Sequence, residues 1–593
     1  MDIRKLVFDL VGCDFTGKIT ETEGDGLSVR YDGREAVISA DTIPAKARGY
    51  MLLAKAIAEG KDCFEIHQEP RFTTVGPMLD LSRGGVMKVS SVKKYLDYMA
   101  VFGMNMLMLY TEDTYEVEGY PFFGYQRGRY TLKELQEIDD YAFSLGIEVI
   151  PCIQTLGHMG QFLRYPTSGI YADTGRVLLI GSEKTYELIR DCIATCRKAF
   201  RTNRIHIGCD EARDLGLGKF LRRNGYQDRF TIFNQHLERV VAICDEFGFH
   251  PMMWSDMYYD IADKNKTEGY GENVQIPQYA IDAMPDCDMV FWDYYHTYNA
   301  FYRTNIEKHN SFGHRTVFAG GIWTQDGFVC NHTYTYDTMK PAMEECLRGN
   351  VQDVIITLWG NDGAETNYFL GLPMFSLFSE YCWLGESCTE DDIWDVSEFV
   401  TGMTKELASA VSDFFFGYEG SVRAGKHILW SDPLINTLFQ GFDMIKGAEL
   451  LTNGLHVFEK YTDHSDAEYF AAVFKAALHK CKIHTELRNR YKSGDRVWMK
   501  DFADNQIPQI VADFENLYRL HYEYWHRDYK TNGFERLMHR HAGAIERIKY
   551  TGKIIHAYLN GELEEIEALE PELAFSVAAH WCDGTEFMYI GDY

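Results

Sequence analysis

The spacing of apolar and polar positions divides the chain into three regions. In the first, residues 1–72, short runs typical of strands flank a segment with helical spacing that ends before Gly60. The expected strands are Leu27–Tyr31, Glu35–Ser39 and Cys63–His67, and the expected helix is Ile43–Glu59. This pattern predicts a small N-terminal α/β domain, in which no residue is a candidate for catalysis.

The second region, residues 73–370, repeats an apolar strand, a turn and a long amphipathic segment. Eight strands are expected, at Pro77–Leu81, Asn105–Tyr110, Glu148–Cys152, Arg204–Gly208, His250–Trp254, Asp288–Trp292, Arg315–Gly320 and Asp353–Leu358. Helical segments between them include Leu132–Leu145, Thr185–Phe200 and Phe230–Phe247. Eight strands alternating with helices predict an α/β fold of the (β/α)8 TIM barrel type.

The third region, residues 371–593, loses this alternation and has scattered apolar positions among many charges. The expected helices are Thr389–Gly417, Asp466–Arg490, Ile507–Tyr529 and Asn532–Glu564. We expect a mainly helical C-terminal domain that packs on the barrel. The pattern does not decide whether it also forms a lid or a homodimer interface.

Composition and charge exclude several classes of partner. With 38 Tyr, 37 Phe and 10 Trp among 593 residues, the chain can build a large core. A net charge of -29 argues against nucleic acid or an anionic membrane as partner. The first ten residues contain no uninterrupted apolar h-region, and no window approaches the apolar length of a membrane span. Because the 14 cysteines are also scattered, we expect a cytoplasmic protein with reduced thiols. Nothing in the sequence indicates a cofactor or a metal. We interpret His539-Arg-His541 as a solvated helix face rather than a metal site.

Acids and aromatic residues gather after the expected strands, where a barrel carries its active site. Those that we expect to bind substrate are Arg83, Asp113, Glu116, Trp254, Asp256, Trp292, Tyr294, Tyr295, Trp323, Trp359 and Asp362. Each alone is more often a packing or capping residue. Together, carboxylates that bind hydroxyls and indoles that cover a pyranose face indicate a carbohydrate.

The fourth strand is followed by two adjacent acids, Asp210 and Glu211, after Gly208. Taken alone, such a pair is well explained as the start of a helix, where acids favour the positive end of the dipole. However, His206-Ile-Gly-Cys-Asp-Glu211 resembles the His-x-Gly-Gly/Cys-Asp-Glu signature of family 20 glycoside hydrolases, the β-N-acetylhexosaminidases. Its continuation, Leu215-Gly-x-Gly218, is similar to the intracellular hexosaminidase D branch of that family.

Two further stretches carry the resemblance. Ile150-Pro-Cys-Ile-Gln-Thr-Leu-Gly-His158 resembles the family's Ile-Pro-Glu-Ile-Asp-x-Pro-Gly-His, which places His158 beside the acid/base. Gly76-Pro-Met-Leu-Asp-Leu-Ser-Arg83 is similar to a motif that begins with a sugar-binding arginine, but Val75 stands in that place here. Arg83 either substitutes for this arginine or pairs structurally with Asp80.

The resemblance implies substrate-assisted hydrolysis, in which the 2-acetamido oxygen of the sugar attacks C1. Glu211 would be the general acid/base, Asp210 would hold the acetamido group, and His158 would support them. The family builds its acetamido pocket from tryptophans, to which Trp254, Trp323 and Trp359 correspond, and Tyr294 or Tyr295 would supply a phenol. With Val75 in place of an arginine, we expect an exo-acting enzyme that removes both β-N-acetylglucosamine and β-N-acetylgalactosamine from small oligosaccharides or glycans. The alternatives are another barrel glycosidase and a non-catalytic sugar-binding protein.

Overall fold

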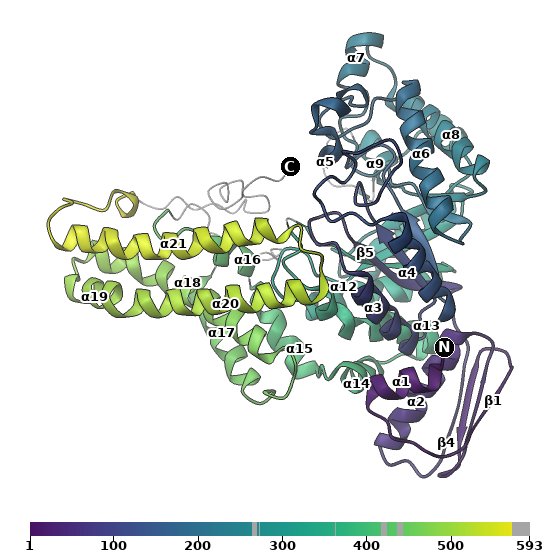
Figure 1. The fold of residues 1–593 in the computed structure, drawn as a ribbon, viewed down its shortest axis with the longest axis horizontal. Helices are drawn as coiled ribbons and strands as arrows, with labels where there is room; N and C mark the ends of the chain where they lie inside the picture. Colours follow the sequence, from purple (N-terminus) through teal and green to yellow (C-terminus); the bar gives the residue numbers. More distant parts are fainter. Residues whose placement is uncertain (264–269, 272, 362, 417–423, 436–442, 572–593) are drawn as a thin grey trace.

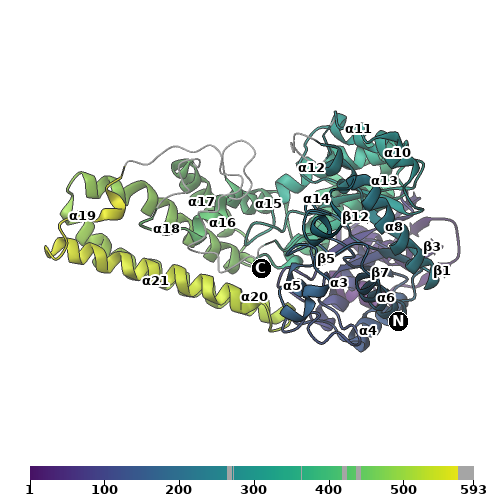
Figure 2. The same ribbon diagram turned by 90° about the horizontal axis from the view of Figure 1, so that it is seen from above.

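The computed structural model describes residues 1–263, 270–271, 273–361, 363–416, 424–435 and 443–571. It consists of a barrel, a small sheet domain at the N-terminus and an elongated group of helices at the C-terminus (Figure 1). Turning the molecule by 90° shows the C-terminal helices extending away from one side of the barrel (Figure 2).

The N-terminal domain is a four-stranded sheet in the order β1-β3-β2-β4, in which only the β1–β3 pair is parallel. Its elements are α1 (Ile3–Val11), β1 (Ile19–Thr22), β2 (Leu27–Tyr31), β3 (Ala36–Ala40), α2 (Ile43–Ala58) and β4 (Phe64–Gln68). Alternate residues of β2 and β3 are buried, as expected of strands with one covered face. The apolar pattern predicted β2, β3, β4 and α2 but not α1 and β1.

Eight parallel strands close into a barrel, which confirms the predicted fold class. They are β5 (Thr74–Asp80), β6 (Met106–Tyr110), β7 (Glu148–Cys152), β8 (Arg204–His206), β9 (His250–Trp254), β10 (Asp288–Trp292), β11 (Thr316–Gly321) and β12 (Asp353–Leu358). β12 pairs with β5 and β9 with β10, so the ring is complete. The strands are almost fully buried because side chains fill the interior and helices cover the outside.

The helices of the barrel region follow the strands as a (β/α)8 fold requires. They are α3 (Val89–Val101), α4 (Leu132–Ser144), α5 (Gly160–Leu163), α6 (Glu183–Ala199), α7 (Lys219–Asn224), α8 (Arg229–Glu246), α9 (Asp256–Ala262), α10 (Gln278–Asp282), α11 (Asn299–Asn310), α12 (His332–Arg348) and α13 (Phe375–Leu384). A capping box at Thr131 and Glu134 begins α4, which explains the accurate start predicted for that helix.

The C-terminal region is helical, as predicted. Its helices are α14 (Glu390–Thr401), α15 (Lys405–Ser412), α16 (Ala424–Trp430), α17 (Met444–Phe458), α18 (Ala467–Lys492), α19 (Arg496–Asp501), α20 (Ile507–Asp528) and α21 (Phe534–Leu559). The single helix expected from Thr389 to Gly417 is wrong. Gly402, in a left-handed conformation with φ 76°, ends α14, and Thr404 caps a new helix.

The interpretation of His539-Arg-His541 as a solvated face is also wrong for two of its three residues. His539 is exposed, but Arg540 and His541 are buried at the contact of α21 with α16 and α20. His541 Nε2 lies 3.0 Å from His521 Nδ1, and burial lowers the pKa of His541 well below its usual value. Both imidazoles therefore belong to the core.

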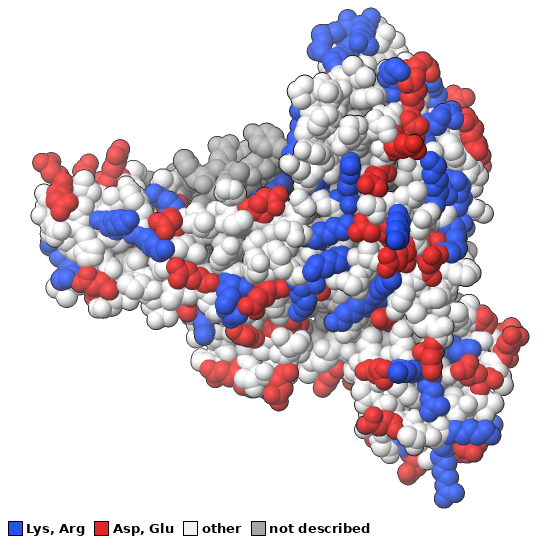
Figure 3. All heavy atoms as spheres, in the orientation of Figure 1, with Lys and Arg blue, Asp and Glu red and all other residues white. Residues whose placement is uncertain are grey.

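On the face shown in Figure 3, acidic and basic side chains are interspersed over the barrel and the C-terminal helices. Within the described ranges, none of the helices combines the length and apolar character that crossing a lipid bilayer requires.

Candidate active site

The two adjacent acids lie in a distorted segment directly after β8. The strand ends at His206, two residues earlier than predicted, and Gly208, Cys209 and Glu211 have positive φ angles of 71°, 76° and 46°. A Cβ at Gly208 would lie 2.2 Å from Gln154 Oε1, so only glycine fits beside that side chain. Non-glycine residues in this conformation are strained, and such strain is typical of functional sites. The segment therefore does not begin a helix, in contrast to the alternative explanation of the acids.

Asp210 and Glu211 differ in their surroundings. Asp210 is 8% exposed, and its Oδ1 accepts a 2.7 Å hydrogen bond from Gln154 Nε2. The Glu211 side chain is 42% exposed, and its backbone N–H donates to Asp256 Oδ2 over 2.9 Å. One carboxylate is thus fixed in the barrel mouth while the other faces solvent, where a substrate can reach it.

His158 connects the two acids. Its Nε2 lies 3.0 Å from Asp210 Oδ2 and 3.5 Å from Glu211 Oε2. Burial opposes the charged imidazolium, but the adjacent Asp210 outweighs it and raises the pKa of His158 to about 9. Burial likewise disfavours the Asp210 carboxylate, yet His158 lowers the pKa of Asp210 below its usual value. The two groups form a charged pair at neutral pH.

The carboxylate of Glu112 and the guanidinium of Arg83 complete this side of the site. Arg83 Nε lies 3.3 Å from Glu112 Oε1, and one of its terminal nitrogens is 3.4 Å from His158 Nδ1. The Arg83 guanidinium also lies 5.9 Å from the ring centre of Trp359. Asp80 instead accepts hydrogen bonds from Ser82 and from the Gly360 N–H. The partner of Arg83 is therefore Glu112 rather than Asp80.

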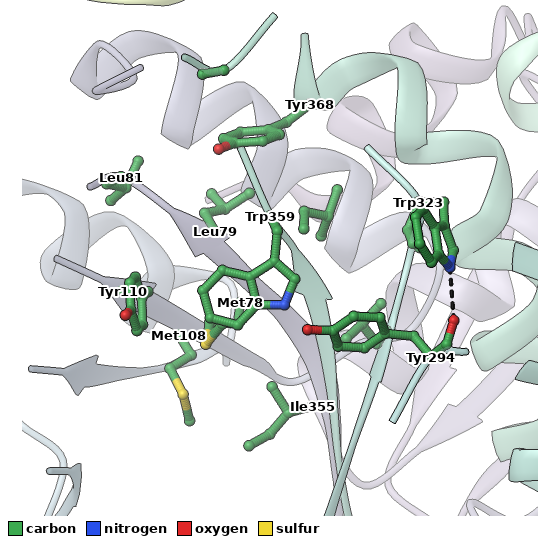
Figure 4. Close-up of a cluster of buried hydrophobic side chains, with 14 of the residues drawn as sticks. Met78, Leu79, Leu81, Met108, Tyr110, Tyr294, Trp323, Ile355, Trp359 and Tyr368 are labelled. Atoms are coloured by element: carbon green, nitrogen blue, oxygen red, sulfur yellow. Dashed lines mark hydrogen bonds between the residues drawn. The ribbon is translucent and has the colours of Figure 1, made fainter. Parts of the chain in front are cut away.

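Aromatic side chains line the neighbouring part of the barrel mouth. The ring centre of Trp359 is 4.9 Å from that of Tyr110 and 6.3 Å from that of Trp254. In Figure 4 the Tyr294 hydroxyl points toward the Trp359 indole, and the Tyr294 carbonyl accepts the Trp323 indole N–H over 2.8 Å. The indole N–H groups of Trp254 and Trp359 are buried and form no hydrogen bond within the described part of the chain. Two donors and one phenol are thus available to a polar group bound among these rings.

Trp292 and Asp256 join this aromatic group to the acids. Trp292 stacks on Tyr294, and its Nε1 donates to Asp256 Oδ1 over 3.3 Å. Because Asp256 also accepts the Glu211 N–H, it contacts both halves of the site from a position that is 2% exposed. Burial, followed by the charges of Asp210 and Asp260, raises the pKa of Asp256 well above its usual value.

Other predicted site residues lie outside these contacts. Asp113 is buried and pairs with Arg127 over 2.8 Å, and the Glu116 backbone N–H donates to the Tyr130 carbonyl. Neither carboxylate hydrogen-bonds to Asp210, Glu211 or His158. Tyr295 is 43% exposed and packs against Tyr294 and Trp323. Asp362 lies outside the described residues.

Three residues of the site were not predicted to belong to it. Glu112, Gln154 and Tyr110 each follow or end a strand in the same way as the chosen residues. Gln154 Nε2 donates to both Asp210 and the Tyr110 hydroxyl. Their position at strand ends was the available signal, but the sequence does not show which strand-end side chain reaches which acid. In the described ranges, no three His, Cys, Asp or Glu side chains are arranged to hold a metal ion.

Comparison with known proteins decides the family. The model of the glycosyl hydrolase family 20 catalytic domain matches residues 72–319, which contain His158, Asp210 and Glu211. The model of the glycoside hydrolase 20C C-terminal domain matches residues 418–581. The chain belongs to glycosyl hydrolase family 20. Both the barrel and the C-terminal region thus have counterparts within the family.

Individual family 20 relatives are distant. Hexosaminidase D of Bos taurus is 26% identical over 225 residues, covering 36% of this chain and 61% of that protein. A beta-hexosaminidase of Porphyromonas gingivalis is 27% identical over 226 residues, covering 32% and 29%. The matches therefore span less than two thirds of these relatives. The chitobiase of Flavobacterium johnsoniae has a similar fold, with a TM-score of 0.50 at 14% identity, over 96% of this chain and 89% of that one.

Proposed function

We propose that the protein is an exo-β-N-acetylhexosaminidase that releases terminal β-linked N-acetylglucosamine and N-acetylgalactosamine from glycans. The observation that carries this proposal is the adjacent pair Asp210 and Glu211, joined by His158 beside a group of tryptophans. Membership in family 20 and relatives named as hexosaminidases support it.

The positions of the two acids favour participation by the substrate. A retaining glycosidase with a protein nucleophile places its two carboxyl groups about 5 Å apart on opposite sides of the scissile bond. Here the second carboxylate, Asp210, is adjacent in sequence and already engaged by His158 and Gln154. We therefore assign the nucleophile to the acetamido oxygen of the sugar itself.

In the first step, this oxygen forms a bond to C1 while the bond from C1 to the leaving oxygen breaks. The leaving oxygen keeps the electron pair and takes a proton from Glu211, whose exposed carboxyl group can reach it. The product of this step is an oxazolinium ion. In the second step, water attacks C1 and gives a proton to the Glu211 carboxylate, which opens the ring with retained configuration.

Asp210 would accept the acetamido N–H and stabilise the positive charge of the oxazolinium ion. This role requires an ionised carboxylate, and His158 favours that form. His158 cannot serve as the nucleophile or the base, because the neighbouring acids keep its imidazole protonated.

The aromatic group would enclose the acetamido methyl and the apolar face of the sugar. Of the two candidate phenols, we favour Tyr294, because its hydroxyl faces Trp359 (Figure 4), whereas Tyr295 is 43% exposed. Val75, which replaces the family's first arginine, is buried in β5 and offers no hydrogen bond to a sugar. Without that contact, we expect both epimers at C4 to be accepted. The cytoplasmic location and a homodimer through the C-terminal helices stay predictions.

Nitrophenyl β-glycosides of N-acetylglucosamine, N-acetylgalactosamine and glucose test the proposal together. We expect hydrolysis of the two acetamido sugars and nearly none of the glucoside, which lacks the internal nucleophile. Comparable turnover of the glucoside would favour another type of barrel glycosidase. Binding of all three without turnover would favour a sugar-binding protein.

A further inference from the structure

The C-terminal helices contact the barrel loops that carry site residues. At the end of α20, the Asp528 carbonyl accepts the Lys88 N–H over 2.9 Å, and the Lys530 N–H donates to the Val86 carbonyl over 2.7 Å. Tyr529 lies between them and forms a bridge with Met87. Arg83 lies in the first part of the loop after β5. The backbone of this loop thus pairs with the backbone of the C-terminal region.

The loop after β12 contacts the C-terminal helices through the buried carboxylate of Glu365. Its Oε1 accepts hydrogen bonds from Trp430 Nε1 on α16 at 2.6 Å and from an Arg540 terminal nitrogen on α21 at 2.8 Å. Its Oε2 lies 2.9 Å from Lys426 Nζ on α16. The Glu365 backbone carbonyl lies 2.9 Å from His521 Nε2 on α20. Three helices therefore converge on one residue of a barrel loop.

The neighbouring residues of this loop make similar contacts. Asn367 Nδ2 donates to Asp528 Oδ2 over 2.6 Å, and the Tyr368 N–H donates to the Tyr529 hydroxyl over 3.0 Å. The segment contains Gly363 and Ala364 with φ angles of 133° and 54°. A non-glycine residue holds such an angle only where surrounding contacts impose it. The Ala364 N–H donates to the Gly360 carbonyl within the loop, and the side chains of Arg536, Leu537 and Arg540 on α21 lie beside Gly363.

The same loop begins with Trp359, whose indole faces Tyr294 and Arg83 in the proposed sugar pocket. The side chains of Glu365, Lys426 and Arg540 are each about 1% exposed. The one carboxylate of Glu365 faces two buried cations, so replacing it leaves both cations uncompensated, whereas replacing Arg540 leaves Glu365 paired with Lys426 and without its ion pair to α21. In either case the loop loses contacts that hold it against the C-terminal helices.

We propose that Glu365 is a positioning residue through which the C-terminal helices hold Trp359 in the sugar pocket. The C-terminal region thereby sets the affinity of the pocket for the terminal sugar, in addition to any contribution to stability. This inference rests on the proposed function for its kinetic consequence, but the placement of the loop can be measured without turnover.

Two arginines on α21 provide a matched comparison. Arg540 pairs with Glu365 of the barrel loop, whereas Arg547, two helical turns later, pairs with Asp432, which lies within the C-terminal region. We would compare Arg540→Met with Arg547→Met in the full chain. Steady-state kinetics on the nitrophenyl glycosides and amide hydrogen exchange of peptides from residues 363–371 would be measured for both. Glu365→Gln serves as a second variant if Arg540→Met does not fold.

For Arg540→Met and Glu365→Gln, we expect kcat/KM to fall about 10- to 100-fold, the scale of a misplacement near 1 Å. KM should rise because the pocket wall contacts the bound sugar in the ground state, and kcat should also fall because the same wall would enclose the acetamido nucleophile. Exchange in residues 363–371 should rise in these variants and stay at the wild-type level in Arg547→Met.

A purely structural role would lower the thermal midpoint of the Arg540 and Glu365 variants without changing KM or the exchange of the loop, and that result would overturn the inference. If the wild-type protein hydrolyses none of the acetamido glycosides, the proposed function fails. In that case the exchange data alone decide whether Glu365 holds the loop.

Discussion

Replacing Asp210 with asparagine tests the charged pair on which the proposed mechanism depends. Asparagine keeps the shape of the side chain and an oxygen that can accept the Gln154 hydrogen bond, but it removes the negative charge beside His158. The variant therefore separates the electrostatic role of Asp210 from its packing.

The strength of the interaction between Asp210 and His158 follows from the pKa of His158. A rise from 6.5 to about 9 corresponds to roughly 3 kcal/mol in favour of the imidazolium. Because burial acts in the opposite direction, Asp210 and, to a smaller extent, Glu112 must together contribute at least this amount. Without Asp210, burial and Arg83 oppose the charged form while Glu112 still favours it, so we expect the pKa of His158 to fall well below 9.

The same change alters stability in a defined pH window. In the wild-type protein the folded pKa of His158 exceeds the unfolded value, so its contribution is fully present below 6.5 and is lost as pH rises through about 9. Asp210→Asn lacks this contribution. The difference in thermal midpoint between wild type and variant should therefore shrink as pH rises from about 6 to about 10.

Labelling histidine at Cε1 with 13C allows the pKa of His158 to be measured by NMR, with His158→Gln to assign its signal. Turnover of Asp210→Asn should also fall by about 10²-fold or more, because the neutral amide cannot stabilise the oxazolinium ion. A His158 pKa that stays near 9 in the variant would refute the charged pair. Normal activity per folded molecule would show that Asp210 is only structural.

Three other predictions follow from the proposed mechanism. Glu211→Gln should lower turnover of natural disaccharides by about 10²-fold or more, and less for aryl glycosides with good leaving groups; unchanged activity on disaccharides would exclude Glu211 as the acid. Glycosides with a free 2-hydroxyl or 2-amino group should be nearly inert, thiazoline mimics should bind far more tightly than the product sugar, and NMR before mutarotation should show retained configuration rather than inversion. The gluco and galacto nitrophenyl glycosides should differ by less than about tenfold in kcat/KM; a preference beyond roughly a hundredfold would reveal a rigid contact to the C4 hydroxyl.

Much of the barrel could be predicted because its signal is local. Each strand is a short apolar run that is buried on both faces, and each expected run coincides with a strand of the structure to within a few residues. Parallel strands in a closed barrel end on one rim, so the position of Asp210 and Glu211 after β8 already placed them with Trp359 after β12. Helix boundaries were less certain, and one glycine, Gly402, separates two helices that the apolar pattern had merged.

Tertiary structure decided which charged groups pair. Arg83 is closer in sequence to Asp80, but its side chain pairs with Glu112, which follows the next strand. Asp113, which was expected to bind substrate, pairs with Arg127. Arg540 lies 175 residues from Glu365, in a segment whose charges indicate a solvated face. Such pairs depend on the distance between side chains after packing, and on the burial that makes an unpaired charge costly. Side-chain distances and burial are set only when the chain folds. The sequence alone therefore determined at which strand ends the acidic and aromatic residues gather, while packing determined what each of them contacts.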